Sequence, residues 1–328
     1  MTTAVIYIDR KRGDHGGSRS LLTSFQKQFP FKINEINPIR GQVFKINTSK
    51  GIFILKGYSS YNRLKLQEAF TSSLKTEGFE QTYTFLSLDQ EPIFYNNQYF
   101  GCMPFIEPHI QTFTYLYESE RQEGLSLLEK YHRTTKQSVQ RYQTILPEFI
   151  LQKKWTERLE QFKKNSKVVG RFIPYEWVFE WINWAEWSLE GIGKGQELID
   201  KEPNVVLHGD VAHHNFLRGK NEKLYLIDFD LISIGPSSMD LLQFANRILP
   251  FINWDINRLA QYKSLKKLLH INPYIYALAY PTDLFREWNR LIREQTYENK
   301  RKLQQVMELT FSKINQRQRF LLDLKNLV

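Results

Sequence analysis

The chain has 328 residues, of which 41% are hydrophobic and 24% are charged, and these are the proportions of a soluble globular protein. That length is enough for two domains or for one domain with two lobes. No run of about 18 apolar residues occurs, so no transmembrane helix is expected. The apolar run near the N-terminus is followed, not preceded, by charged residues, which is not the order of a secretory signal.

Net charge and cysteine content limit the classes of binding partner and the cellular compartment that are expected. The net charge of +10 at pH 7 indicates an anionic partner, such as a phosphate compound, a nucleic acid or an acidic surface. The basic residues are spread over several predicted helices and no nucleic-acid motif is present, so nucleic-acid binding is not expected. Cys102 is the single cysteine; it excludes an internal disulfide and a cysteine zinc site, and it favours a reducing, cytoplasmic compartment.

The first 30 residues read as a segment that precedes the main fold. Residues 4–8 predict a short strand, residues 12–18 a glycine-containing turn and residues 19–29 an amphipathic helix. A strand, a glycine-rich turn and a helix in this order can bind a phosphate group. The glycines do not form GxGxxG, however, and no acidic residue follows at the expected place, so a flexible turn is the preferred interpretation.

Residues 31–58 contain three short β-rich runs. The runs are FKINEINPI, QVFKINTS and GIFILKGY, and they are separated by the turn pairs Arg40–Gly41 and Lys50–Gly51. Short runs of this composition between glycine turns predict an antiparallel meander.

A helix and two more strands are predicted next. The helix covers residues 61–76 and has Gly78 as its C-terminal cap. The strands lie around QEPIFYNN and QYFGCMPFIE, with Asn96–Asn97 as the turn between them. Pro104 and Pro108 then interrupt the pattern, which suits a linker between lobes.

From residue 109 onward the pattern is mainly helical. Apolar residues recur at helical spacing in residues 116–135, and residues 174–192 contain four tryptophans. Tryptophans at helical spacing indicate core packing in preference to a ligand site. Residues 298–324 read as one basic amphipathic helix, for which a solvated surface is preferred to membrane or nucleic-acid contact.

The helical pattern breaks at residues 205–230, VVLHGDVAHHNFLRGKNEKLYLIDFD. An apolar strand ends just before Asp210, and a predicted hairpin then runs from Asn215 to Asp228. Two strand ends would therefore bring these three side chains together. An amide and a carboxylate are oxygen ligands that suit Mg²⁺, and a separate carboxylate can orient an attacking hydroxyl and accept its proton.

Two other interpretations of this stretch stay open. His208, His213 and His214 could form a zinc site, although zinc would need a fourth ligand and the two adjacent histidines would point apart. Alternatively, the stretch is a plain buried hairpin in which Asp210 only caps a turn.

The segment HGDVAHHNFL…LYLIDFD resembles the HGDxxxxN and IDF or IDW motifs of the aminoglycoside phosphotransferase and choline kinase-like superfamily. The small N-terminal sheet, FILK and LLEKYHRTT add to the resemblance, which covers about residues 31–320. Within the superfamily, EGFEQTYTF, the following hairpin and the chain length are most similar to the spore-coat CotS-related branch, including the YutH-type proteins.

The resemblance implies an α+β fold of two lobes like that of protein kinases. It places a small antiparallel-sheet lobe at residues 1–103, including the extra segment 1–30, and a hinge at residues 104–108. The mainly helical C-terminal lobe is then residues 109–328 and carries the hairpin 205–230. Met103 to Glu107 would contact adenine through backbone groups.

The resemblance also implies roles for residues of the C-terminal motifs. Asp210 is similar to the catalytic base, and Asn215 and Asp228 match the Mg²⁺ ligands. His208 matches a histidine that braces the loop backbone. Asp240 matches an acidic residue that commonly follows the metal-binding aspartate, and a structural role at a helix N-terminus is its alternative.

In the N-terminal lobe the resemblance implies a nucleotide-binding set. Lys56 matches the strand lysine that contacts the nucleotide phosphates. Glu68 is the best candidate for its helical carboxylate partner, and Glu77 is its rival. Gly41 and Arg40 lie in the loop that would cover the nucleotide, and Glu107 ends the hinge.

The implied function is phosphoryl transfer from ATP or GTP, with Mg²⁺, to a hydroxyl of an unidentified small molecule. The chain departs from the family because its nucleotide-covering loop has only Gly41, and because no acceptor signature can be recognised. The alternative is therefore a catalytically weak or inactive kinase-like structural protein of the spore coat, with other coat proteins as partners.

Overall fold

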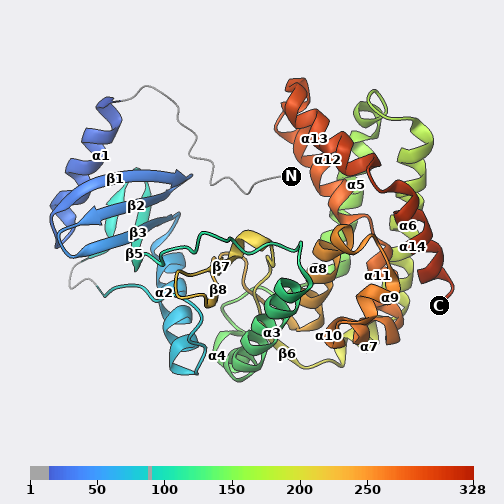
Figure 1. Cartoon of the computed structure of the whole chain (residues 1–328), viewed down its shortest axis with the longest axis horizontal. Helices are drawn as coiled ribbons and strands as arrows, with labels where there is room; N and C mark the ends of the chain where they lie inside the picture. Colours follow the sequence, from blue (N-terminus) through green and yellow to red (C-terminus); the bar gives the residue numbers. More distant parts are fainter. Residues whose placement is uncertain (1–14, 88–90) are drawn as a thin grey trace. The chain divides into compact units, whose positions relative to one another are not determined.

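The computed structural model describes residues 15–87 and 91–328 (Figure 1). The strand predicted for residues 4–8 lies outside these residues. Of the turn predicted for residues 12–18, the part from His15 onward is already helical, so the turn prediction is wrong there. The chain forms two compact units: the first comprises residues up to Phe113 together with His214–Asp230, and the second comprises Thr114–His213 and Leu231–Val328.

The first unit is built on a five-stranded antiparallel sheet in the order β1-β2-β3-β5-β4. Its elements are α1 (His15–Gln28), β1 (Ile33–Arg40), β2 (Val43–Thr48), β3 (Gly51–Tyr58), α2 (Tyr61–Thr76), β4 (Ile93–Tyr95), β5 (Gln98–Pro104), β7 (Phe216–Arg218) and β8 (Leu224–Leu226). The predicted meander, helix and second hairpin are confirmed. Asn96 and Asn97 form the tight turn between β4 and β5 with φ angles of 47° and 56°.

The two faces of this sheet carry different helices. Phe25 and Phe29 of α1 pack with Phe100 of β5 in an apolar cluster on one face. Side chains alternate along a strand, so Gly101 points to the opposite face, where α2 lies. A Cβ atom at Gly101 would come within 2.6 Å of Leu64 Cδ1 on α2, so the absence of a side chain permits this close packing.

Cys102 lies in the same apolar cluster as the α1 phenylalanines and is 2% exposed. Burial raises the pKa of its thiol to about 12. The thiol is therefore protonated at neutral pH and shielded from reagents as long as the sheet stays closed.

Helix α2 has well-formed ends. Its N-terminal cap is Ser60, whose side chain accepts a backbone hydrogen bond from the first turn. At the other end Gly78 has a φ of 92° and donates its N–H to Lys75, and Phe79 donates to Leu74 at 2.8 Å. This is the glycine-terminated motif that the sequence predicts.

The β7–β8 hairpin packs with the first unit, whereas the resemblance places residues 205–230 with the C-terminal lobe. Backbone hydrogen bonds explain the difference. They run from His109 N to Arg218 O at 2.8 Å, from Lys220 N to Glu107 O at 2.8 Å, and from Leu226 N to Gln81 O at 2.9 Å.

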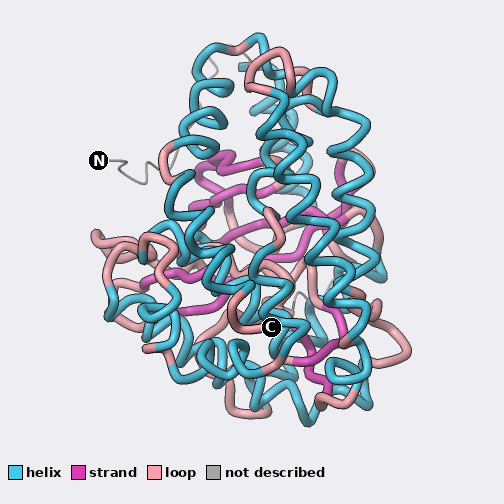
Figure 2. The backbone as a smooth tube through the Cα atoms, turned by 90° about the vertical axis from the view of Figure 1, so that its right-hand side faces the viewer, coloured by secondary structure: helices cyan, strands magenta, loops and turns pink. Residues whose placement is uncertain are grey.

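The second unit is mainly helical, and helices make up most of the backbone in Figure 2. Its α-helices are α3 (Glu118–Thr135), α4 (Val139–Tyr142), α5 (Leu151–Val169), α6 (Tyr175–Lys194), α7 (Gln196–Asp200), α8 (Ser238–Ile248), α9 (Ile256–Ala260), α10 (Lys263–Lys266), α11 (Asn272–Ala279), α12 (Thr282–Arg293), α13 (Lys300–Phe311) and α14 (Ile314–Lys325). Five 3₁₀ turns occur in the described chain: η1 (Lys136–Ser138), η2 (His213–Asn215), η3 (Leu249–Ile252), η4 (Lys267–His270) and η5 (Thr296–Glu298). Strand β6 (Asn204–Leu207) pairs antiparallel with β9 (Ser233–Pro236).

The tryptophan-rich helix α6 packs into the helical core as predicted. Trp181 is fully buried, and the ring of Phe162 on α5 contacts it at 6.4 Å between centroids. Phe162 also stacks on Phe285 of α12 at 4.1 Å, so α5, α6 and α12 share one aromatic core.

The C-terminal segment differs from the prediction. Residues 298–324 form two helices, α13 and α14, with a break at Ser312–Lys313, and each helix contributes buried groups. Val306 and Thr310 are buried on α13, and Phe320 is buried on α14. None of the described helices is both long and apolar enough to cross a membrane.

Candidate active site

Lys56 on β3 is the centre of an acidic cluster in the first unit. Lys56 pairs across strands with Gly101 and so faces away from the α1 cluster. Its ammonium nitrogen lies 2.7 Å from Asp228 Oδ1 and 2.8 Å from Asp230 Oδ1, and its side chain is only 14% exposed. Lys56 and Asp228, both predicted site residues, are thus brought together, and Asp230 is a partner that the sequence analysis missed.

Arg40 ends β1, and Gly41 begins the turn that leads to β2. Gly41 has a φ of 52°, and no atom would contact an added Cβ, so the need for glycine there is conformational. An Arg40 guanidinium nitrogen lies 3.7 Å from Asp228 Oδ2, but the arginine side chain is 72% exposed. The pair therefore adds little stability, and Arg40 is a cation open to solvent beside the acidic cluster.

Glu68 does not form the ion pair with Lys56 that the resemblance implies. Its carboxylate instead bonds to Lys65 on the same helix at 2.8 Å. The neighbouring Gln67 is buried, and its amide donates to the carbonyl of Phe229 at 2.8 Å. Helix α2 therefore reaches the acidic segment through Gln67, because one residue rotates the helix by about 100°.

The predicted adenine-contacting segment, Met103 to Glu107, is held by backbone bonds within the first unit. Phe105 N–H donates to Ile52 O at 3.1 Å, and Glu107 O accepts from Lys220 N–H at 2.8 Å. The Glu107 carboxylate also lies 3.0 Å from Lys220 Nζ, with both side chains exposed. Contact of this segment with adenine stays a prediction.

Asn215 and Asp228 lie at the same end of the β7–β8 hairpin. Phe216 pairs with Leu226, and just beyond them Ile227 N–H donates to Asn215 O at 3.0 Å. Asn215 is 2% exposed, whereas the Asp228 side chain is 27% exposed. Asp228 has a φ of 69°, a conformation that costs free energy for a residue with a side chain and is enriched at functional sites.

The donor groups at this hairpin end suit a hard divalent cation. Asp228, Asp230 and Asn215 offer carboxylate and amide oxygens, and Mg²⁺ in phosphoryl-transfer sites is held by one or two carboxylates together with substrate phosphates. The part of the chain that the structure describes contains no group of three His, Cys, Asp or Glu side chains placed to hold a metal ion, so the zinc interpretation gains no support.

Asp210 belongs to the second unit, in the loop that follows β6. The backbone N–H groups of His208 and Gly209 donate to the Asp240 carboxylate at 2.7 and 3.0 Å, and His132 Nε2–H donates to it at 2.9 Å. Asp240 is fully buried. His208 Nδ1 in turn accepts from the backbone N–H of Asp210 at 3.3 Å, which agrees with the bracing role expected for His208.

Gly209 meets a steric requirement in this loop. Its φ is 80°, and an added Cβ would lie 2.1 Å from the carbonyl oxygen of Leu231. Any other residue would have to displace backbone at the position immediately before Asp210. A side chain at this position would therefore disturb the loop between β6 and Asp210.

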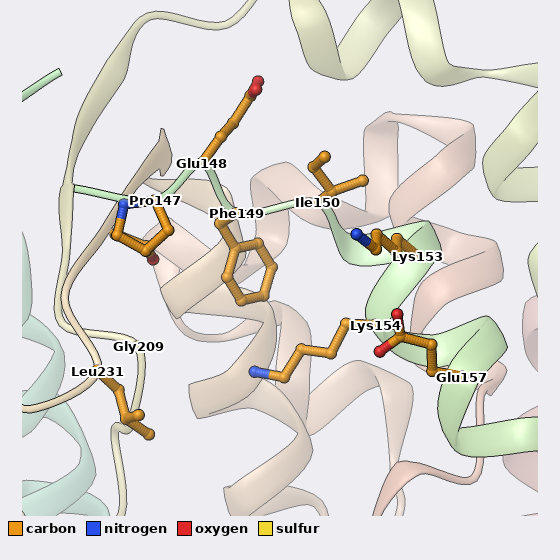
Figure 3. A pocket seen from close by; sticks show the side chains of 10 residues that line it. Pro147, Glu148, Phe149, Ile150, Lys153, Lys154, Glu157, Gly209 and Leu231 are labelled. Carbon is orange, nitrogen blue, oxygen red and sulfur yellow. The ribbon is translucent and has the colours of Figure 1, made fainter. Parts of the chain in front are cut away.

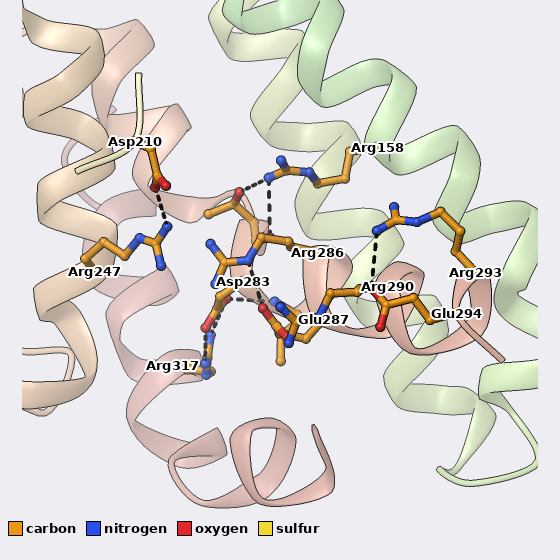
Figure 4. A network of polar contacts seen from close by, with 12 residues as sticks. Arg158, Asp210, Arg247, Asp283, Arg286, Glu287, Arg290, Arg293, Glu294 and Arg317 are labelled. Carbon is orange, nitrogen blue, oxygen red and sulfur yellow. Dashed lines mark hydrogen bonds and ion pairs between the residues drawn. The ribbon is translucent and has the colours of Figure 1, made fainter. Parts of the chain in front are cut away.

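Arg247 on α8 is a partner of Asp210 that the sequence analysis missed. Its guanidinium nitrogen lies 3.2 Å from Asp210 Oδ1, with both side chains about one-third exposed (Figure 4). Arg247 follows Asp240 by seven residues on one helix, so both project from the same face. This spacing was the available signal, because a helix that holds the loop through Asp240 can hold Asp210 through Arg247.

The buried Asp240 predicts a loss of stability in acid. Burial alone would raise the pKa of Asp240, but the hydrogen bond and charge of His132, together with His208, lower it below its usual value. A carboxyl group with a lowered folded-state pKa stabilises the protein above its unfolded pKa of about 3.9 and loses that contribution as the pH falls through the folded pKa. We expect the urea concentration at the unfolding midpoint to decrease as the pH is lowered below about 4. The Asp240→Asn variant should show a smaller pH dependence in this range. Equal pH dependence in both proteins would contradict this assignment.

Sequence comparison places the Asp210 loop in a known family. The model of the phosphotransferase enzyme family matches residues 110–268, a range that contains Asp210, Asn215, Asp228 and Asp240. This segment of the chain is therefore similar to the phosphotransferase enzyme family. The prediction of a phosphotransferase is thereby confirmed at family level, whereas the CotS-related branch gains no support. No curated protein sequence matches the chain significantly.

Solved phosphotransferases share the fold. The chain matches an aminoglycoside phosphotransferase from Alicyclobacillus acidocaldarius with a TM-score of 0.66 and 15% identity, covering 92% of this chain and 94% of that chain. It matches an aminoglycoside 2'-phosphotransferase in its GDP complex with a TM-score of 0.60 and 12% identity, covering 90% and 97%. It matches spectinomycin phosphotransferase in complex with ADP and spectinomycin with a TM-score of 0.53 and 16% identity, covering 93% of this chain and 93% of that chain. The predicted α+β kinase-like fold is therefore confirmed.

Proposed function

We propose that this phosphotransferase-family protein transfers the terminal phosphoryl group of ATP or GTP to a hydroxyl of a small molecule. The observation that carries the proposal is the cluster in which Lys56 contacts Asp228 and Asp230 at one end of the β7–β8 hairpin. A strand lysine beside two carboxylates is the arrangement needed to bind phosphates together with a metal ion. The relatives with ADP and GDP make a nucleotide the natural donor.

The acidic cluster would hold Mg²⁺ through Asp228, with Asn215 as the amide ligand and Asp230 beside them. When bound, Mg²⁺ supplies positive charge to the phosphate oxygens. The residues of this chain supply the rest: Lys56 would bind the nucleotide phosphates after releasing one of its carboxylates. Arg40, on the solvent side of Asp228, would add a second cation.

In the second unit Asp210 would act as the base. Its carboxylate would accept the proton of the acceptor hydroxyl as that oxygen bonds to the terminal phosphorus and the bond from phosphorus to the bridging oxygen breaks. Arg247 holds one carboxylate oxygen, and the loop is fixed through Asp240, so Asp210 has a defined orientation before the acceptor arrives.

A nucleotide-binding test centres on Lys56. Wild-type protein should gain saturable thermal stability with Mg²⁺-ATP or Mg²⁺-GTP, and Lys56→Met should reduce the binding and lower any transfer by about 100-fold or more. Lys50→Met, an exposed lysine in the β2–β3 turn, is the matched control. Melting curves without nucleotide give each variant its own baseline.

The outcomes separate an active phosphotransferase from a kinase-like structural protein. Stabilisation that is lost in Lys56→Met and retained in Lys50→Met supports the phosphotransferase. Absence of any shift at millimolar nucleotide would favour the structural protein. The spore-coat association is proposed from the resemblance of EGFEQTYTF, residues 77–85, and the hairpin that follows.

A further inference from the structure

Basic side chains from three helices form a cluster in the second unit that reaches Asp210 through Arg247. They are Lys154 and Arg158 of α5, Arg247 of α8 and Arg286 of α12, which together are named the cationic cluster (Figure 4 labels all but Lys154). Arg247 bonds to Asp210, and Arg286 bonds to Glu287 at 2.9 Å. These two arginines therefore already have carboxylate partners.

Lys154 and Arg158 differ from these two arginines. In the described parts of the chain, no carboxylate lies within ion-pair distance of either one. Arg158 donates to the hydroxyl and the carbonyl oxygen of Thr282, which are both neutral groups. The Lys154 ammonium lies 4.9 Å from the ring centroid of Phe149. One helical turn separates the two cations, so they project from the same face of α5.

The cationic cluster is held together against electrostatic repulsion. Desolvation by the surrounding protein lowers the pKa of Lys154, and the nearby charge of Arg158 lowers it further, whereas Asp210 acts in the opposite direction. Desolvation also lowers the pKa of Arg158, with Arg286 and Arg247 adding to the effect. Cations that repel one another and lack carboxylates would gain free energy from a bound anion.

Lys154 also lines a pocket beside the loop that carries Asp210. The pocket has a volume of about 280 Å³, and Phe149, Gly209 and Leu231 are among its lining residues (Figure 3). In Figure 3 the Lys154 side chain extends into the space in front of Gly209 and Leu231. Gly209 immediately precedes Asp210, so a ligand in this pocket lies next to the candidate base.

Two glutamates at the pocket, Glu148 and Glu157, do not reverse this charge. Both are exposed to solvent, as is Lys154, so screening weakens their interaction with it. Lys153 also lines the pocket, so its two glutamates are matched by two lysines. Of the cationic cluster, Lys154 is the member that lines the pocket itself.

We propose that the acceptor of this phosphotransferase is a small hydroxyl compound that carries its own negative charge, as a phosphate or carboxylate group, and that Lys154 and Arg158 bind that group. The inference rests on the proposed function, because it assigns the acceptor end of the same reaction. It also predicts discrimination: a polycationic aminoglycoside would meet repulsion from the cluster, whereas a phosphorylated or carboxylated polyol would pair with it.

The test is calorimetric titration of the full chain with pyrophosphate as the anionic probe and kanamycin as the polycationic probe. Titrations are run at low ionic strength, both without nucleotide and with Mg²⁺ and a non-hydrolysable ATP analogue at saturation. We expect pyrophosphate to bind in both series and Lys154→Gln to weaken that binding by about tenfold or more. Lys164→Gln, an equal charge change at an exposed position of the same helix, should leave the affinity unchanged.

Each outcome decides for or against the inference. Pyrophosphate binding that Lys154→Gln and Arg158→Gln weaken, and that Lys56→Met retains, supports an acceptor-side anion site. Binding that only Lys56→Met weakens assigns the anion to the nucleotide site and overturns the inference. Tighter binding of kanamycin than of pyrophosphate, or no pyrophosphate binding at millimolar concentration, also overturns it. Failure of the proposed function is separate, because it appears as absence of Mg²⁺-ATP stabilisation in the wild-type protein.

Discussion

Replacement of Asp210 by asparagine is expected to remove phosphoryl transfer almost completely and to leave the fold and nucleotide binding intact. Asparagine has nearly the same shape but cannot accept the hydroxyl proton, and a positioned general base contributes about 10²- to 10⁴-fold to the rate. The measurement is initial rate of transfer with the acceptor identified by screening, together with thermal stabilisation by Mg²⁺-ATP. The loss should fall on kcat, because the substrates still bind.

The control for this variant is Asp200→Asn, the same chemical change at an exposed residue of the second unit. It should behave as the wild type in both measurements. A second variant, Arg247→Gln, tests the positioning of the base. Arg247 is not expected to receive the proton, so its loss should change kcat less than Asp210→Asn does and should alter the pH profile of the rate. A wild-type rate for Asp210→Asn would show that another group receives the proton.

Asp240→Asn should cause a large loss of stability, greater than that of Asp210→Asn or Lys56→Met. Asp240 is fully buried and accepts from His208 N–H, Gly209 N–H and His132 Nε2–H. An asparagine there turns one acceptor oxygen into a donor that faces other donors, and breaking a buried charged pair typically costs about 3–5 kcal/mol. The free energy of unfolding from urea titration at pH 7 measures the effect.

Asp200→Asn serves again as the matched control and should change that free energy by about 0.5 kcal/mol or less. The Asp240 variant should also lose transfer in proportion to the disorder of the loop that precedes Asp210. A variant that unfolds at the wild-type urea concentration would indicate that the buried carboxylate is not what holds the loop. His132→Ala would then identify whether the histidine carries the contribution by itself.

Much of the fold followed from local patterns in the sequence. The helix at residues 61–76 was predicted with its observed ends, because Ser60 and Gly78 are strong local signals at its two termini. The β4–β5 and β7–β8 hairpins followed from turn residues between alternating apolar positions. The spacing of Asn215 and Asp228 correctly indicated that both lie at one hairpin end.

The partners of the site residues could not be read from those patterns. Lys56 could pair with any acidic residue that the fold brings near, and the structure selects Asp228 and Asp230 in place of Glu68. The rotation of α2 about its axis determines whether Gln67 or Glu68 faces the segment that carries Asp228. The sequence does not give the rotation of a helix relative to a distant segment. The break at Ser312–Lys313 was also missed, because no glycine or proline marks it in the sequence.

The single thiol offers a way to time the opening of the first unit. Cys102 is enclosed by the α1 phenylalanines, and its pKa is raised by burial, so a thiol reagent can attack it only after the β-sheet has parted from that helix. Labelling kinetics at this one position therefore give an opening rate for the first unit without any engineered reporter. Comparison of the Cys102 labelling rate with and without Mg²⁺-ATP then measures how much the nucleotide slows the opening of this unit.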